Sequence, residues 1–336
     1  MPHLFVLAFT FVPSALLSFR FSNALVTGFY KVAAVWLGML NYFFLAACFA
    51  WPISLAFRLS RPGSAPLDYR PPIVYILFAL ALAISIWGLL NARLVRVHRV
   101  SVKLANLPAA WRGRKALLLS DLHLGPINAV RFSRRIVSLA AGLKPDIIFL
   151  PGDVFDGTRT TPDRLTEPFR QLAPPLGIFF STGNHDEFGD TSHFLAAIRN
   201  AGIRVLNNEK VIVDGLQILG VPYHDTTYPM RLRANLESLA IDRSTASILL
   251  SHVPNRLPIA EEAGITLQLS GHTHGGQFAP YTWLTRRIFG KFTHGLHPFG
   301  RLQVFTSYGA GTWGPPMRIG TTPEVVLISF ESSTPC

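Results

Sequence analysis

Residues 147–156 read IIFLPGDVFD, and the rest of the chain is interpreted around this stretch. Ile147 to Leu150 form an apolar run that is too short for a helix and suits a strand in the middle of a sheet. Asp153 follows soon after, next to Gly152, a residue that lets other backbone approach closely. A carboxylate at the end of a buried strand is poorly solvated and well placed to hold a cation. We therefore interpret Asp153 as a carboxylate that bridges two metal ions.

Four other segments end an apolar run with side chains that bind metals. They contribute Asp121 and His123, Asn184 and His185, His252, and His272 with His274. Oxygen and imidazole ligands without thiolate favour manganese, iron or zinc over magnesium or calcium, so we expect two divalent cations, manganese first among them. Two such ions, about 4 Å apart, would lower the pKa of a shared water and hold a phosphate oxygen. The pattern predicts a phosphoester hydrolase.

His185 is given a separate role as an imidazole that does not bind metal. It would protonate the leaving oxygen or stabilise developing charge, with Asp186 orienting it. Asp156 is expected to support the site by hydrogen bonding. Taken singly, these residues also suit surface turns, a helix cap or structural histidines at strand ends. We infer a site because five such segments each follow a strand.

The pattern from Arg96 onward is that of a mixed α/β domain. Strands are expected at residues 97–104, 116–119, 146–150, 177–181, 204–206, 211–213, 216–221, 247–250, 265–269, 302–306 and 324–330, and helices at 129–141, 163–172, 192–201 and 231–241. Early βαβ units followed by more strands than helices predict a mixed-sheet sandwich with helices outside.

Residues 1–95 differ in composition from the remainder and predict a transmembrane region. The chain of 336 residues is 49% hydrophobic and 15% charged, and residues 1–95 contain a single acidic residue, Asp68. Pro71 to Ala92 and Val32 to Phe57 are long and apolar enough to span a bilayer. Leu4 to Phe19 is a shorter third candidate, with a signal peptide as its alternative. We therefore divide the chain into three transmembrane helices within 1–95 and a catalytic domain at 96–336.

Basic residues give the expected orientation of this multi-pass protein. Arg93, Arg96, Arg99, Lys103, Arg112, Arg114 and Lys115 follow the last span, and Arg20 and Lys31 lie between the first two; Arg58, Arg61 and Arg70 lie on the opposite side. The positive-inside rule then places the catalytic domain on the cytoplasmic face. The net charge of +12 fits a membrane protein with basic flanks better than a nucleic-acid partner. Cys48 and Cys336 imply no disulfide framework, and no segment identifies a protein partner.

The five motifs together resemble a known family. SDLHLG (120–125), GDVFDG (152–157), GNHDE (183–187), SHVPN (251–255) and GHTHGGQ (271–277) look like the motif set of the calcineurin-like metallophosphoesterases, over residues 96–336. The resemblance implies that Asp121, His123, Asp153 and His274 hold one ion, that Asp153, Asn184, His252 and His272 hold the other, and that His185 is the catalytic imidazole. It also implies a metallophosphatase-like fold: a two-sheet β sandwich flanked by helices in four layers, with the dimetal site at the strand ends.

The apolar N-terminus and the segment GTWGPPMRIGTTPEV (311–325) look like the bacterial membrane-anchored branch of that family, which implies the bacterial inner membrane. Some members of related branches cleave the pyrophosphate of UDP-2,3-diacylglucosamine, a lipid A precursor, and this is a specific alternative. A membrane protein that binds phosphorylated ligands without turning them over and a nuclease are the alternatives from other classes. The complete motif set favours an enzyme.

The segment Phe278 to Phe299 bears on the substrate. It mixes Trp283 and Phe289 with Arg286 and Arg287, directly after the paired histidines. A segment with apolar and basic residues together can enter a headgroup layer and hold an anionic lipid near the metals. The alternative is a helix packed on the sandwich. We predict a lipid-linked phosphoester or pyrophosphate as substrate and membrane lipid as a partner.

Overall fold

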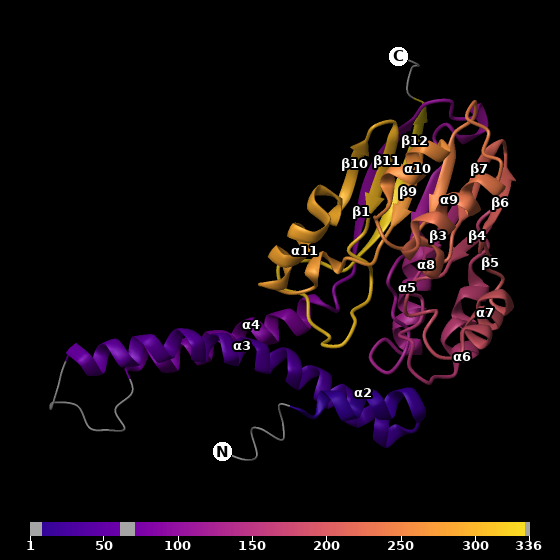
Figure 1. Cartoon of the computed structure of the whole chain (residues 1–336). Coiled ribbons are helices and arrows are strands. Elements are labelled where there is room, and N and C mark those ends of the chain that lie inside the picture. Colours follow the sequence, from indigo (N-terminus) through magenta and orange to yellow (C-terminus); the bar gives the residue numbers. More distant parts are fainter. Residues whose placement is uncertain (1–8, 61–70, 333–336) are drawn as a thin grey trace.

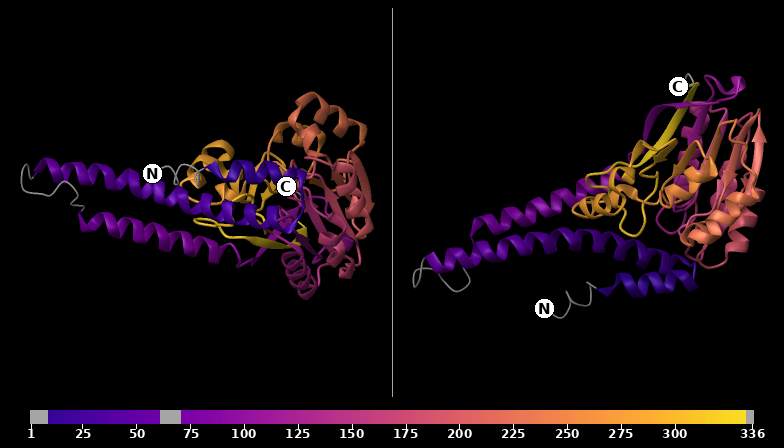
Figure 2. Two further views of the ribbon diagram at one scale, coloured as in Figure 1. Left: turned by 90° about the horizontal axis from the view of Figure 1, so that it is seen from below. Right: turned by 45° about the horizontal axis from the view of Figure 1, so that its top comes forward.

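The computed structural model describes residues 9–60 and 71–332, and all structural statements refer to these residues. Two six-stranded sheets face each other in the domain that begins at Arg96, and helices cover their outer faces (Figure 1). This four-layer α/β arrangement confirms the predicted fold class. Long helices project from one side of the domain, as both views in Figure 2 show.

Both sheets are mixed. The first has the order β1-β12-β2-β3-β4-β5, with β1 Arg96–Leu104, β2 Lys115–Leu118, β3 Ile147–Pro151, β4 Ile178–Ser181, β5 Arg204–Val205 and β12 Glu324–Ser332. The second has the order β10-β11-β9-β8-β7-β6, with β6 Glu209–Val213, β7 Leu216–Gly220, β8 Ser247–Leu250, β9 Leu267–Ser270, β10 Gly295–Phe299 and β11 Leu302–Thr306. The parallel strands β2, β3 and β4 of the first sheet and β8 and β9 of the second carry the predicted site segments at their carboxyl ends.

Three apolar clusters hold the layers together. Leu118, Phe149 and Ile248 belong to the cluster between the sheets. A second cluster lies between the first sheet and helices α5 (Val130–Leu143), α6 (Pro162–Thr166) and α7 (Thr191–Asn200), and a third packs the second sheet on α9 (Pro229–Ser238) and α10 (Leu257–Ala263). The remaining elements of the domain are α8 (Tyr223–Thr227), α11 (Tyr281–Phe289), and the 3-10 turns η1 (Ala109–Trp111), η2 (Glu167–Gln171), η3 (His274–Gly276) and η4 (Gly290–Thr293).

The predicted strands are present with small shifts of their ends, but several short elements were missed. Strand β10 and helices α8 and α10 were not expected, whereas α11 lies within 278–299, where a helix was the alternative considered. The helix expected at 163–172 was wrong as a single element. It is divided into α6 and η2, and Pro168 lies at the division. A proline lacks the backbone N–H that a continuing α-helix needs, so the helix ends there.

In the described part of the N-terminal region, residues 9–60 and 71–95, the helices are α2 (Phe11–Arg20), α3 (Ala24–Ser60) and α4 (Pro72–Asn91). Helices α3 and α4, of 37 and 20 residues, are the two in the described part of the chain that are long and apolar enough to cross a membrane. With 10 residues, α2 is about 15 Å long, half of what a span needs. The predicted span at Leu4 to Phe19 begins outside the described residues and stays a prediction. Helix α3 begins before the expected Val32 because Lys31 is exposed and does not interrupt it.

The long helices are docked on the loops that follow the paired histidines. The Tyr42 hydroxyl donates to the carbonyl of Ala279 (2.7 Å), and the Asn91 side-chain amide donates to the carbonyls of Arg318 (2.9 Å) and Thr321 (3.0 Å). Gly88 approaches Ile319 so closely that a Cβ atom would collide with its side chain. These contacts place α3 next to the candidate site.

Candidate metal centre

The predicted ligands meet at one edge of the sandwich. Asp121, Asp153 and Asn184 follow β2, β3 and β4, while His252 and His272 follow β8 and β9. The carboxyl ends of these strands come together from both sheets, so residues far apart in sequence become neighbours. Three groups of side chains have ligand atoms all within 4.8 Å of one another: Asp121, His123 and His274; His123, Asp153 and His185; and Asp153, His252 and His272.

The backbone at this edge adopts an uncommon conformation. Five of the gathered residues have positive φ angles, namely Asp121 (53°), His123 (45°), Asp153 (54°), His272 (70°) and His274 (46°). Residues other than glycine seldom adopt this left-handed region, and those that do cluster at functional sites. The turn after each strand therefore directs its side chain towards a common centre at some cost in backbone energy.

Two glycines make the close approach of these turns feasible. A Cβ atom at Gly183 would collide with the carboxylate and amide of Asp153, and one at Gly271 would collide with Ser120 and with the carboxylate of Asp121. Glycine has no Cβ, so the two loops can pass beside the carboxylates. This explains the glycine directly before Asn184 and the one directly before His272.

The donor set of this site fits divalent cations. His252 directs Nδ1 at the carbonyl of Pro151 (2.8 Å), so Nδ1 carries the proton and donates it. Its other nitrogen, Nε2, lies 3.1 Å from Oδ2 of Asp153 and 4.0 Å from Oδ1 of Asp121. Burial would lower the pKa of His252, but these two carboxylates raise it to about 10. A divalent cation between this imidazole and the carboxylates would replace the Nε2 proton. Two further atoms that can bind a metal ion, Asn184 Oδ1 and His272 Nδ1, lie 3.1 Å apart.

Burial favours the uncharged form of each group, so it raises the pKa of the carboxylates and lowers the pKa of the imidazoles. Burial alone would raise the pKa of Asp153, but His252 and His123 lower it, so this carboxylate is ionised. Burial raises the pKa of Asp121 to about 6, lowers that of His272 to about 4, and lowers that of His123 well below its ordinary value. The uncharged rings of His123 and His272 beside the ionised Asp153 are in the protonation state that metal binding requires.

His185 lies beside the centre, as predicted, and the structure shows what holds it. Its backbone N–H donates to Oδ1 of Asp153 (2.8 Å), and its Nδ1 donates to the carbonyl of Asp156 (3.0 Å). Its ring packs edge-on against Phe188 at 5.0 Å and lies 5.5 Å from the ring of Trp313. The Nε2 atom is therefore the nitrogen left for a reacting group.

The expected role of Asp186 was wrong. Its carboxylate accepts three backbone N–H groups, from Asp153 (2.7 Å), Gly183 (2.9 Å) and Phe155 (2.9 Å), and no described contact joins it to the His185 ring. Asp186 thus fixes the turn that carries Asp153. The orientation of the His185 ring comes from the Asp156 main chain, and the Asp156 carboxylate lies 3.9 Å from His123 Nδ1, in line with a supporting role.

Arg318 is the main component of the site that sequence reasoning missed. Its side chain is fully buried, and its guanidinium lies 2.9 Å from His274 Nδ1 while donating to the carbonyls of His274 (3.0 Å), Tyr308 (2.8 Å) and Gly311 (2.6 Å). Arg318 therefore connects the loop that carries His274 to residues 308–311. The arginine lies inside the segment 311–325, but only a structure can show that this arginine turns inward.

The predicted substrate-binding residues lie on α11, at the edge of the candidate metal centre. Helix α11 contains Trp283, Arg286 and Arg287, which are exposed, and the Arg287 guanidinium lies 5.3 Å from the Trp283 ring centre. The Phe289 ring is 6.1 Å from that of His272, so the end of α11 reaches the centre. By contrast, His224, a histidine outside the five motifs, is exposed and contacts Arg231.

Comparison with other proteins gives the family of the chain. The sequence model of the calcineurin-like phosphoesterase family matches residues 114–276 of this chain. An uncharacterized metallophosphoesterase from Aquifex aeolicus is 32% identical over 265 residues, which cover 75% of this chain and 98% of that protein. The chain belongs to the calcineurin-like metallophosphoesterase family.

Two vertebrate members of this metallophosphoesterase family are also similar. Both are named transmembrane protein with metallophosphoesterase domain: the one from Danio rerio is 29% identical over 82% of this chain, and the one from Bos taurus 31% identical over 80%. The matched regions cover 66% and 64% of those two proteins, so the chain spans slightly less than two thirds of their length. The match extends beyond residues 114–276, since it includes most of the chain.

Proposed function

We propose that this protein is a membrane-anchored, dimetal-dependent phosphohydrolase that cleaves a phosphoester or pyrophosphate bond in a lipid-linked substrate. The family assignment and the convergent ligand set support the reaction. One further observation supports the substrate class: a largely apolar cavity of about 730 Å³ joins the metal centre to the long helix α3.

The cavity has a polar end and an apolar end. His272 and His274 line it at the metal centre, and Leu37, Leu40 and Phe44 line it on α3. An amphiphile placed here would have its phosphate at the ligands and its hydrocarbon along the helix. Ligand sites commonly combine such an apolar wall with a few polar groups that fix orientation. A soluble phosphorylated metabolite would leave the apolar half of the cavity unused.

Membrane anchoring is supported by α3 and α4, which are apolar around most of their circumference and expose large side chains such as Trp51, Tyr75 and Trp87. Exposed apolar surface of this extent is unfavourable in water and favourable in lipid. The names of the two vertebrate relatives point the same way. The cavity then lies where the membrane helices meet the domain.

Helix α11 would complete the membrane-facing surface. Trp283, Leu284 and Ile288 are exposed by 64%, 49% and 66%, next to Arg286 and Arg287. Figure 1 shows α11 on the side of the domain from which α3 and α4 project. An apolar helix face with basic neighbours suits the headgroup layer of an anionic membrane.

The position of the charges favours the cytoplasmic face of a bacterial inner membrane for the domain. With α3 and α4 forming a hairpin, Arg20 and Lys31 lie on the same side as Arg93 and Arg96, while Arg58 lies near the opposite end. This asymmetry agrees with the positive-inside rule whether or not a further span precedes α2.

The chain's own residues would bind and orient the phosphate and move one proton. When bound, two divalent cations, preferably manganese, supply positive charge for the phosphoryl oxygens and an acidic water. In its protonated form His185 would donate the Nε2 proton to the leaving oxygen and then take up a proton from solvent, while its Nδ1 stays engaged by the Asp156 carbonyl. Phe188 and Trp313 limit the access of water to that imidazole.

A matched pair of variants tests the substrate class. Phe44 and Phe49 lie on the same helix and are equally exposed, at 64%, but only Phe44 lines the cavity. We expect Phe44→Ala to lower turnover of a lipid phosphoester in mixed micelles about tenfold, since burying a phenyl ring contributes about 1.5–3 kcal/mol. A soluble aryl phosphodiester should be hydrolysed unchanged, and Phe49→Ala should match the wild type on both. Equal behaviour of the two variants on the lipid would refute a lipid-linked substrate while leaving the reaction itself untouched.

A further inference from the structure

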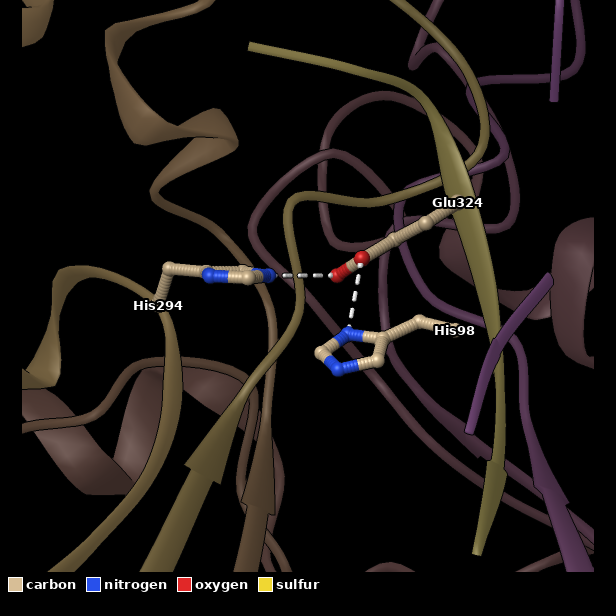
Figure 3. A group of neighbouring side chains, drawn as sticks. All are labelled: His98, His294 and Glu324. Atoms are coloured by element: carbon tan, nitrogen blue, oxygen red, sulfur yellow. Dashed lines mark hydrogen bonds and ion pairs between the residues drawn. The ribbon is translucent and has the colours of Figure 1, made fainter. Parts of the chain in front are cut away.

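A second cluster of metal-binding side chains lies outside the dinuclear centre (Figure 3). His98 comes from β1, His294 precedes β10, and Glu324 is the first residue of β12. His98 Nδ1 lies 3.2 Å from Oε2 of Glu324, and His294 Nε2 lies 3.0 Å from Oε1. The three ligand atoms are all within 4.8 Å of one another, with both imidazoles directed at one carboxylate.

The cluster closes one side of the sandwich. β1 is the edge strand of the first sheet and β10 is the edge strand of the second. The rings of His98 and His294 stack at 5.7 Å and lie 6.0 and 6.5 Å from the ring of Phe305, a residue of the core between the sheets. A group bound by both histidines would therefore join the two sheets at their open edge.

Two groups of the loop that follows β11 hold the carboxylate of Glu324 in place. Oε1 of Glu324 accepts from the Ser307 hydroxyl (3.1 Å) and from the Tyr308 backbone N–H (3.0 Å). The His294 ring stacks on that of Tyr308 with 3.7 Å between centres. Partners of this kind, which orient a ligand without touching the ion, are the usual second layer around protein metal sites.

Charge and access also suit a cation. The carboxylate of Glu324 supplies the negative charge of the cluster, and each imidazole can offer a nitrogen to a metal ion. The side chains of His98 and His294 are 37% and 25% exposed, while that of Glu324 is 5% exposed. The anion is thus buried, and the imidazoles leave a path from solvent.

We infer that His98, His294 and Glu324 form a third metal site, which takes one zinc-like divalent ion with water in the remaining position. Bonds of about 2.0–2.2 Å in tetrahedral geometry place neighbouring ligand atoms about 3.4 Å apart, close to the two separations here. Two imidazoles and one carboxylate form a donor set that zinc uses. The site binds metal for structure, since it joins β1, β10 and β12.

The site is connected to the dinuclear centre through one loop. The Tyr308 carbonyl accepts from Arg318, whose guanidinium lies against His274, and the Gly311 backbone N–H donates to the carbonyl of Asp121 (2.8 Å). An ion on Glu324 would therefore steady the loop 307–311 that backs two of the predicted ligands. The inference does not depend on the substrate proposed above.

Zinc stoichiometry of the full-length protein in detergent tests this site. The wild type, His98→Gln and His294→Gln are each equilibrated with Zn²⁺ alone and freed of excess metal. Their zinc content is then measured by plasma mass spectrometry. Glutamine can still donate a hydrogen bond to Glu324 but is a poor zinc ligand. We expect His98→Gln and His294→Gln each to retain one equivalent of zinc fewer per chain than the wild type, with the dinuclear centre common to all.

His193→Gln is the matched control. His193 is also paired with a carboxylate, Asp163, at 3.5 Å, but it belongs to no group of three ligands among the described residues. It should bind as much zinc as the wild type. Zinc should also raise the unfolding temperature of the wild type more than that of His98→Gln. Equal stoichiometry in the wild type and both cluster variants would overturn the inference and leave a hydrogen-bonded His-Glu-His network.

Discussion

The Nε2 atoms of His123 and His274 lie 2.9 Å apart, although the residues are separated by 151 positions in the chain. His123 follows β2 of the first sheet and His274 follows β9 of the second. Oδ1 of Asp121 lies 3.4 Å from the same nitrogen of His274. Burial lowers the pKa of both imidazoles, so two neutral rings face each other beside a carboxylate. The site therefore exists only when both sheets are assembled, and a cation satisfies all three groups at once.

His185→Ala is expected to lower the turnover of an aryl phosphodiester about 10²–10⁴-fold, the usual contribution of a positioned acid or base. Metal content should stay at the wild-type level, because alanine keeps the backbone N–H that donates to Asp153. Turnover and bound manganese are measured on the same preparation. Loss of a metal equivalent together with activity would make His185 a ligand instead.

Asp186→Ala should act through stability and metal affinity. The change leaves three buried backbone N–H groups without their acceptor, each at a cost of about 1–3 kcal/mol. We expect a lower unfolding temperature and about 10–100-fold weaker manganese binding, as for other residues that support a ligand.

Saturation with manganese then distinguishes the two roles considered for Asp186. If Asp186 supports the Asp153 turn, excess metal should restore much of the activity. A variant with normal stability and metal affinity but a low kcat would instead mean that Asp186 acts on the His185 ring.

Glu324→Gln should remove a dependence of stability on pH. The folded-state pKa of about 2 lies below the ordinary value of 4.5, so the ionised carboxylate stabilises the fold above about pH 4.5 and this contribution is lost as the pH falls towards about 2. With a chelator present, the unfolding temperature of the wild type should exceed that of the variant by the largest amount near about pH 4.5 and by less as the pH falls towards about 2. A difference that stays constant throughout would show that the carboxylate is not specially stabilised.

Much of the fold was predictable because its central strands are short, buried and mostly apolar runs bounded by turn residues. Ile147 to Leu150 and Ser247 to Leu250 are buried at every position, so strand and layer follow from composition. Strand β10 was missed because it contains Gly295 and Pro298 and is only partly buried. Its pairing with β11 comes from tertiary contacts, which local pattern does not encode.

The ligand positions were predictable for a different reason: polar residues that interrupt buried strands need a partner. Roles that depend on direction were not predictable. Asp186 and His185 are adjacent in sequence, yet the carboxylate turns to the backbone of Asp153 while the imidazole turns to the carbonyl of Asp156 beside the centre. The cluster of His98, His294 and Glu324 was not predicted, because its members are distant in the chain. Such roles are set by topology.

The most direct measurement compares bound manganese and aryl phosphodiester hydrolysis in Asp153→Asn and the wild type. Asp163→Asn, a change at an exposed carboxylate paired with His193, is the control. Our account predicts that Asp153→Asn retains less metal and is slower by about 10³-fold, since the ions contribute several kcal/mol to the transition state. An Asp153→Asn protein that keeps the wild-type metal content and rate would contradict the shared carboxylate.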